Sequence, residues 1–248
     1  MPDELVHYKV SDGVAHIILD SQHNKNALSR QLVSELLGHL ERAADDDTVK
    51  LVLLRAEGTV FCSGADLSEM AAGPEDAPRG MIDIFRRITS HEKPVVAAVH
   101  GAVRAGGIGI VGACDIVVAA ENATFALAEV RLGLTPAVIS LTLLPRMTPR
   151  AASLTFLTGS TFTGRDAVGY GLVTKAVHAD ELNAEVDEIC GALAKGHPQG
   201  LRETKKLLGE ALTRHIDAGT DEMAALSARL FASDAAKEAM LAFLNRKK

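Results

Sequence analysis

Apolar residues follow two alternating patterns in the first half of the chain. Short and nearly continuous apolar runs predict buried strands at 14–20, 49–56, 94–100 and 114–120. Between them, apolar residues recur every three or four positions, which predicts one helix from an N-cap at Ser29 to Arg42 and another over 79–91. Strands that alternate with helices and are apolar on both faces predict a layered α/β fold.

The second half of the chain has only the helical spacing. It predicts helices at 149–157, 180–195, 201–217 and 221–245. We therefore expect an α/β core over 1–190 and a C-terminal helical region over 191–248. Helices of this kind leave apolar residues exposed when isolated, so we expect the region to pack on the core or on a neighbouring subunit. An oligomer is the expected state.

Composition narrows the classes of partner and compartment. The chain has 248 residues, 47% of them hydrophobic and 23% charged, which suits one large globular unit. A formal net charge of -6 provides no general basic field, so neither nucleic acid nor membrane is an expected partner. The start of the chain has no signal-like pattern and no long apolar run follows, so we expect a cytoplasmic protein.

Cysteine and histidine spacing bears on metal and redox chemistry. Cys62, Cys114 and Cys190 are far apart and form no C-x-x-C pair, so we interpret them as buried thiols rather than disulfides or zinc ligands. The nine histidines form no H-E-x-x-H or similar spacing, and no metal is expected.

The segment 61–70, F-C-S-G-A-D-L-S-E-M, is the first candidate for chemistry. Its small residues suit a turn that presents backbone N–H groups to a negative charge. Ser63 lies in no G-x-S-x-G context, so a nucleophilic role is not indicated and its hydroxyl is expected to bond within the turn.

The segment 101–115, G-A-V-R-A-G-G-I-G-I-V-G-A-C-D, permits two interpretations. Gly107, Gly109 and Gly112 match G-x-G-x-x-G, the fingerprint of dinucleotide binding. That fingerprint directly follows the first strand of a βαβ unit, whereas six residues separate Gly107 from His100 here. In the competing interpretation a helix begins at Ala105–Gly107, and its unpaired N–H groups face an anion.

Glu129 is the third candidate, in the segment A-T-F-A-L-A-E-V-R-L-G-L-T-P. A carboxyl group among apolar residues can have a raised pKa that suits proton transfer near neutral pH. A surface ion pair with Arg131 is the alternative, and the fragment alone leaves both open.

Taken together, these segments resemble the crotonase superfamily, the enoyl-CoA hydratase and isomerase family. F-C-S-G-A-D-L is similar to its F-x-A-G-A-D-[LI] signature, and P-V-V-A-A-V-H-G-A-V-R-A-G-G is similar to its second signature. H-N-K-N-A-L-S, T-F-A-L-A-E-V-R-L-G-L and T-F-T-G-R-D-A-V-G-Y-G-L-V extend the resemblance over almost the whole chain. It implies a crotonase fold, in which repeated ββα units form a spiral core with a C-terminal helical region, and a trimer or dimer of trimers.

The resemblance also implies a site. The N–H groups of Ser63 and Gly106 would form an oxyanion hole for the oxygen of an acyl-CoA thioester, and Glu129 would be the acid/base. Coenzyme A would enter as part of the substrate, with no separate cofactor. The positions implied to contact the substrate or its CoA portion are Lys25, Ala27, Leu28, Ala65, Asp66, Leu67 and Ala137.

One departure from the family pattern affects the reaction. Many family hydratases carry a second glutamate three residues after the oxyanion glycine, where this chain has Gly109. Hydration of a 2-enoyl-CoA with Glu129 alone is our first expectation, and isomerisation of a 3-enoyl-CoA to a 2-enoyl-CoA is the alternative. A catalytically weak acyl-CoA binding protein is the second alternative. Acyl chain length, branching and pathway are left open.

Overall fold

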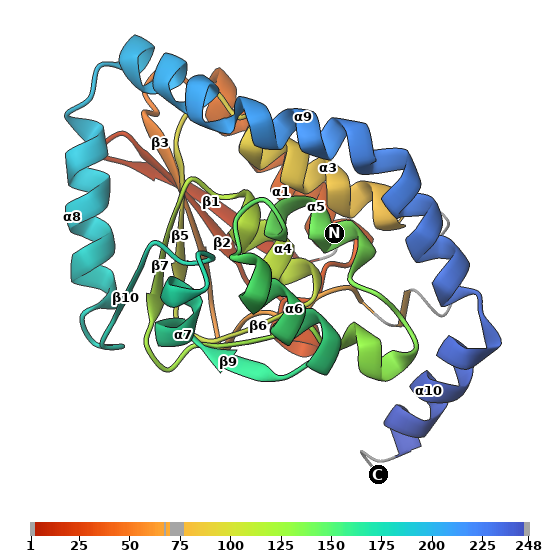
Figure 1. Ribbon diagram of the computed structural model, residues 1–248. Coiled ribbons are helices and arrows are strands. Elements are labelled where there is room, and N and C mark those ends of the chain that lie inside the picture. The colour runs from red at the N-terminus through yellow and green to blue at the C-terminus, as the bar shows by residue number, and fades with distance from the viewer. Residues whose placement is uncertain (1–2, 67, 70–76, 246–248) are drawn as a thin grey trace.

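Two sheets form the centre of the molecule (Figure 1). The computed structural model describes residues 3–66, 68–69 and 77–245. The large sheet has the order β1 (Val6–Ser11), β2 (Val14–Leu19), β3 (Leu51–Ala56), β5 (Val95–Val99), β7 (Ile116–Ala120) and β10 (Lys175–Val177), parallel except for the β1–β2 hairpin. The small sheet has the order β4 (Val60–Cys62), β6 (Ala102–Arg104), β8 (Thr124–Ala126) and β9 (Thr161–Thr163).

The chain repeats one unit three times. Each unit adds a strand to the large sheet, then a strand to the small sheet, and then a helix. The helices that complete the units are α3 (Ala77–Thr89), α4 (Gly106–Ala113) and the 3-10 helix η2 (Ala128–Leu132). This arrangement confirms the predicted α/β fold of repeated ββα units.

The large sheet is covered on both faces, as the apolar runs predicted. One face packs against α1 (Arg30–Asp45), α3 and α4 to form the main core, with Phe61, Phe85 and Phe125 completely buried. The other face packs under α8 (Leu182–Ala194), whose Leu182, Val186 and Cys190 are buried. Ser29 is the N-cap of α1, because its Oγ accepts a hydrogen bond from the Leu32 N–H at 3.3 Å.

The prediction for the last helices was wrong in one respect. The segments predicted as 201–217 and 221–245 form a single helix, α9 (Pro198–Phe231), followed by α10 (Asp234–Asn245). α9 continues through Gly219, which lies between the two predicted helices, and at this position it packs closely on Leu141 of α5 (Ala137–Leu143). In the sequence, the shorter helices α6 (Pro149–Thr158) and α7 (Gly164–Gly169) come between α5 and α8.

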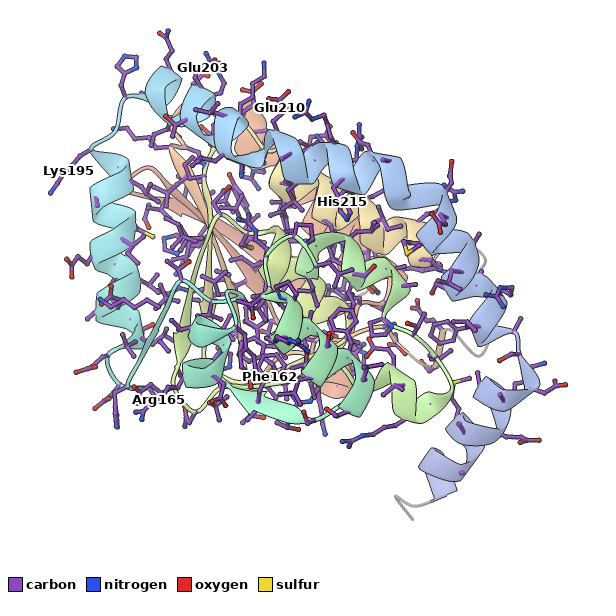
Figure 2. The ribbon with its side chains drawn as sticks, viewed as in Figure 1. Phe162, Arg165, Lys195, Glu203, Glu210 and His215 are labelled. Atoms are coloured by element: carbon purple, nitrogen blue, oxygen red, sulfur yellow. The ribbon has the colours of Figure 1, made fainter. Side chains whose placement is uncertain are left out.

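The long helix α9 packs on the same chain, across α3 and α5 (Figure 1). Figure 2 shows Glu203 and Glu210 along its outer side, and both are exposed. The predicted boundary between 190 and 191 falls inside α8, and the division into two domains stays a prediction. Among the described residues, no helix is both long and apolar enough to cross a lipid bilayer.

A buried ion pair attaches α9 to the core. Lys205 Nζ lies 2.6 Å from Asp115 Oδ2 and 2.9 Å from the Ile88 carbonyl oxygen, and only 4% of the lysine side chain is exposed. The same Asp115 oxygen accepts the Val95 N–H at 2.7 Å. A helix that reaches the core through a buried charge has one register on it, because any shift would leave Asp115 unpaired.

Loss of this lysine should therefore weaken the fold. We expect Lys205→Ala to lower the free energy of unfolding by about 3 kcal/mol, because removal of one partner leaves a partly buried carboxylate without its counter-ion. Asp217→Ala, which removes the exposed ion pair with Arg86 between α9 and α3, is the control and should cost less than about 1 kcal/mol. Urea unfolding followed by circular dichroism measures both, and equal losses would contradict the assignment.

Candidate functional site

A cavity of about 870 Å³ opens between the small sheet, the loop before α1, the turn after β4, η2 and the C-terminal part of α9. The sequence-predicted site residues that the structure describes all line it: Lys25, Ala27, Leu28, Ser63, Ala65, Asp66, Gly106, Glu129 and Ala137. Leu67, the remaining predicted position, is outside the described residues. Segments from four parts of the sequence thus meet at one place.

The turn after β4 presents an N–H group, but the donor differs from the predicted one. The Ser63 N–H already donates to the Lys25 carbonyl oxygen at 3.2 Å, and its Oγ donates to the Asn24 carbonyl oxygen at 3.1 Å. The Ser63 hydroxyl therefore bonds to the loop before α1, and not within its own turn as expected. Within the described part of the chain, no acceptor is found for the Ala65 N–H. Ala65 is thus an available donor of this turn, and it lines the cavity.

The second N–H comes from the start of α4. Ala105 precedes the helix with φ 44 and ψ -120, an unfavourable conformation for a residue with a Cβ. Gly64, at φ 92, packs against it so closely that an added Cβ would lie 2.8 Å from the Ala105 Cβ. The two turns are therefore in contact, and among the described residues the Gly106 N–H at the helix start has no acceptor. The predicted helix start at Ala105–Gly107 is confirmed.

The three glycines of the G-x-G-x-x-G match lie in α4, where they allow side chains of other elements to pack closely against the helix. A Cβ on Gly107 would lie 2.7 Å from the Cys62 Cβ, and one on Gly109 would overlap the ring of Phe85, with Cε1 and Cε2 at 2.8 Å. Gly112 is crowded by Leu143 and Thr142. Side chains occupy the space at each glycine, so the dinucleotide interpretation is not supported.

Phe85 also explains the departure at Gly109. This ring is fully buried on α3 and fills the volume where a side chain of residue 109 would begin. A carboxylate therefore has no room at this position unless Phe85 moves.

Glu129 is the acidic group of the cavity. It lies in η2, where burial raises the pKa of its carboxyl from an ordinary 4.5 to about 7. Its Oε2 is buried and has no hydrogen-bond partner among the described residues. Arg131 instead donates to the Thr158 carbonyl oxygen, with Nη2 at 3.2 Å, so the expected alternative of a Glu129–Arg131 surface ion pair is not found in the described structure.

The loop before α1 is joined to the turn after β4. Leu28 pairs with Ala65 in a parallel bridge, and its N–H donates to the Gly64 carbonyl oxygen at 2.8 Å. Asn24 Nδ2 donates to Asp66 Oδ2 at 2.9 Å. Burial opposes ionisation of Asp66, but hydrogen bonds from Ser68 and Asn24 outweigh it and lower the pKa. Asp66 therefore orders this loop, while Lys25 is exposed at the rim of the cavity.

Some cavity residues were not found from the sequence. Ser227 and Phe231 of α9 line the cavity, and so does Met81 of α3. Their apolar spacing indicates only helices, because the pattern is the same whether a face meets a core or a ligand. The helix α10 also packs on η2: Ala236 is fully buried, and an added Cβ on Gly133 would lie 3.2 Å from the Ala235 backbone.

The cavity thus combines two backbone N–H donors with a carboxyl group of raised pKa, an arrangement that is suited to proton transfer beside a developing negative charge. Comparison with known proteins gives the family. The model of the enoyl-CoA hydratase/isomerase family matches residues 9–248. The solved structure of an enoyl-CoA hydratase from Mycobacterium avium has a TM-score of 0.92 and 44% sequence identity, over 98% of this chain and 97% of that one.

Two relatives represent the two kinds of activity in this family. The crotonyl-CoA hydratase of Syntrophomonas wolfei is 33% identical over 229 residues, 90% of this chain and 88% of that protein. The peroxisomal Delta(3,5)-Delta(2,4)-dienoyl-CoA isomerase of Arabidopsis thaliana is 28% identical over 263 residues, 99% of this chain and 95% of that protein. The chain belongs to the enoyl-CoA hydratase/isomerase family of the crotonase superfamily, and it is an enzyme of the hydratase or isomerase type.

Glu129 should make stability depend on pH. Its folded-state pKa of about 7 lies above its ordinary 4.5, so its contribution to stability is greatest below pH 4.5 and is lost as the pH rises to 7. We expect Glu129→Gln, which cannot ionise, to exceed the wild type in free energy of unfolding by about 3 kcal/mol at pH 8. The difference should shrink steadily towards pH 5. Urea unfolding across this range measures it, and a difference independent of pH would refute the burial of an ionisable group here.

Proposed function

We propose that this enzyme adds water to a 2-enoyl-CoA to form a 3-hydroxyacyl-CoA, with Glu129 as the only acid/base. The observation that supports this proposal most directly is the Glu129 carboxyl group, which has a pKa of about 7 and a buried Oε2 with no hydrogen-bond partner among the described residues, in the cavity that also contains the free N–H groups. At this pKa both protonation states are populated near neutral pH, as a group that must accept and then return a proton requires.

The backbone donors act on the thioester. We assign the oxyanion hole to the N–H groups of Ala65 and Gly106, because the Ser63 N–H is already bonded to Lys25. As negative charge develops on the thioester oxygen, both donors stabilise it in a site shaped before the reaction begins. A donor of this kind typically contributes about 10²- to 10³-fold in rate.

The reaction with one carboxyl group has two steps. In the first, the Glu129 carboxylate takes a proton from water while the water oxygen bonds to C3, and the C2–C3 double-bond electrons move to form an enolate. In the second, the enolate collapses and C2 takes the same proton back from Glu129. Both steps occur on one face of the substrate, because a single group serves them.

The CoA portion would lie along the joined loops. The bridge between Leu28 and Ala65 leaves backbone groups of both segments at the edge of the cavity, with Ala27 on one side and Asp66 on the other. Lys25 is exposed at the same edge, where its ammonium group can approach a phosphate. Ala137, the first residue of α5, lines the cavity and would contact the acyl group.

Isomerisation is the second candidate, and Phe85 is the observation that favours it. Where many relatives place a second glutamate, this ring fills the space beside Gly109, so no carboxyl group at that position can hold a water molecule. Glu129 alone could move a proton from C2 to C4 of a 3-enoyl-CoA, and that reaction requires no bound water. A binding protein with little activity is the remaining alternative.

An absorbance assay separates the three functions. We expect purified protein to remove the conjugated absorbance of 2-enoyl-CoA thioesters, because hydration breaks the conjugation. Appearance of that absorbance from 3-enoyl-CoA would establish isomerisation instead, and neither change would indicate binding only. In either enzyme, Glu129→Gln should lower kcat by at least about 10³-fold, since the proton then has no carrier.

The matched control is Glu121→Gln, an acidic residue outside the cavity whose carboxylate pairs with Arg165. This variant should keep a nearly normal rate. Binding of a saturated acyl-CoA, measured by calorimetry, should be unchanged within a few-fold in Glu129→Gln. A nearly normal rate in Glu129→Gln would overturn the assignment of Glu129 for both reactions.

A further inference from the structure

Two apolar side chains meet directly over the proposed donor at Gly106. A Cβ built on Gly106 would lie 2.7 Å from both Sδ and Cε of Met81 and 2.8 Å from Cδ1 of Leu28. The two side chains therefore contact the same point, one from α3 and the other from the loop before α1. Leu28 and Met81 thus form an apolar contact directly at Gly106.

Leu28, Met81 and Gly106 meet in the cavity, and the two side chains differ in conformational freedom. All three residues line the cavity, but Leu28 is 7% exposed and its backbone is held by the bridge to Ala65. Met81 is half-buried on α3 and is an unbranched side chain with several rotatable bonds. Of the two walls, Met81 is the one that can be moved or shortened without disturbing the proposed oxyanion turn.

We infer that Met81 limits the size of the acyl group and that the enzyme selects short-chain acyl-CoA thioesters. This inference rests on the proposed function for the position of the thioester: its oxygen is placed at the Gly106 N–H, so the first carbons of the acyl chain start beside Met81. A longer or branched chain meets the Met81 thioether and has to displace it. The substrate class is thus set by a side chain on α3 rather than by the backbone donors.

Phe85 and Ile88 extend the same face of α3 away from the cavity. Residues 81, 85 and 88 are spaced at four and three, so they lie on one side of the helix. Phe85 and Ile88 are fully buried and neither lines the cavity, in contrast to Met81. Only the Met81 end of this face therefore meets the acyl chain.

The test compares binding of saturated acyl-CoA thioesters, which requires no turnover. Dissociation constants for butanoyl-CoA and decanoyl-CoA are measured by calorimetry for the wild type and for Met81→Ala. We expect the wild type to bind butanoyl-CoA at least as tightly as decanoyl-CoA. Met81→Ala should shift the ratio towards decanoyl-CoA by at least about tenfold, the usual scale for a change of this size in an apolar pocket.

Ile88→Ala is the matched control, because it removes the same number of heavy atoms from the same face of α3 but outside the cavity. Its ratio should remain within about twofold of the wild type, while Met81→Leu, which restores most of the volume, should keep the short-chain preference. Met81→Val gives a milder truncation with the same expected direction if Met81→Ala does not fold.

Three results would overturn the inference: a wild type that strongly prefers decanoyl-CoA, an unchanged ratio in Met81→Ala, or an equal shift in Ile88→Ala. The last would mean that α3 had loosened as a whole. If binding follows the expected pattern but no enoyl-CoA is converted, the size limit stands and the proposed reaction fails. If enoyl-CoA is converted but Met81 does not affect the chain-length preference, the proposed reaction stands and the size limit fails.

Discussion

The close packing around α4 is the constraint on which the site depends. Glycine at 106, 107, 109 and 112 allows side chains from other elements to contact the helix backbone. This packing fixes where the Gly106 N–H begins, how the turn at Gly64 meets it, and what lies beside the donors. The same close packing leaves no room for a side chain at residue 109, where Phe85 lies. The position of the donors and the absence of a carboxyl group at residue 109 therefore both follow from the packing around α4.

Unlike this packing, the burial of the Glu129 carboxyl group opposes the stability of the fold when the group is ionised. Its environment disfavours the charged carboxylate, and neither a cation nor a hydrogen bond compensates Oε2 in the described part of the chain. The fold holds the group there because η2 is confined on both sides, by the body of the protein and by α10 at Gly133. In the proposed reaction, the stability given up at this carboxyl group would be the basis for proton transfer near neutral pH.

Sequence patterns predicted four strands of the large sheet, β2, β3, β5 and β7, and the N-cap of α1, because burial on both faces and capping are local signals. They did not predict β1, β10 or the short strands of the small sheet. They were less informative where two distant segments decide the outcome. Nothing around Gly219 shows that α9 continues, since the contact with Leu141 is not visible in the local pattern. The choice between the N–H groups of Ser63 and Ala65 likewise depends on the Lys25 carbonyl oxygen, which lies 38 positions earlier in the sequence and meets the turn only in the fold.

The division of labour between backbone and side chains has a consequence for specificity. Donors supplied by Ala65 and Gly106 are backbone groups, so substitution of most side chains leaves their chemistry in place. In the proposed site the acyl group would meet side chains from separate elements, Leu28 from the loop before α1 and Met81 from α3. Such walls can change one residue at a time without disturbing the charge-stabilising turn. Under the proposed assignment, the backbone sets the kind of charge that is stabilised, while the residues that close over the acyl chain set its size.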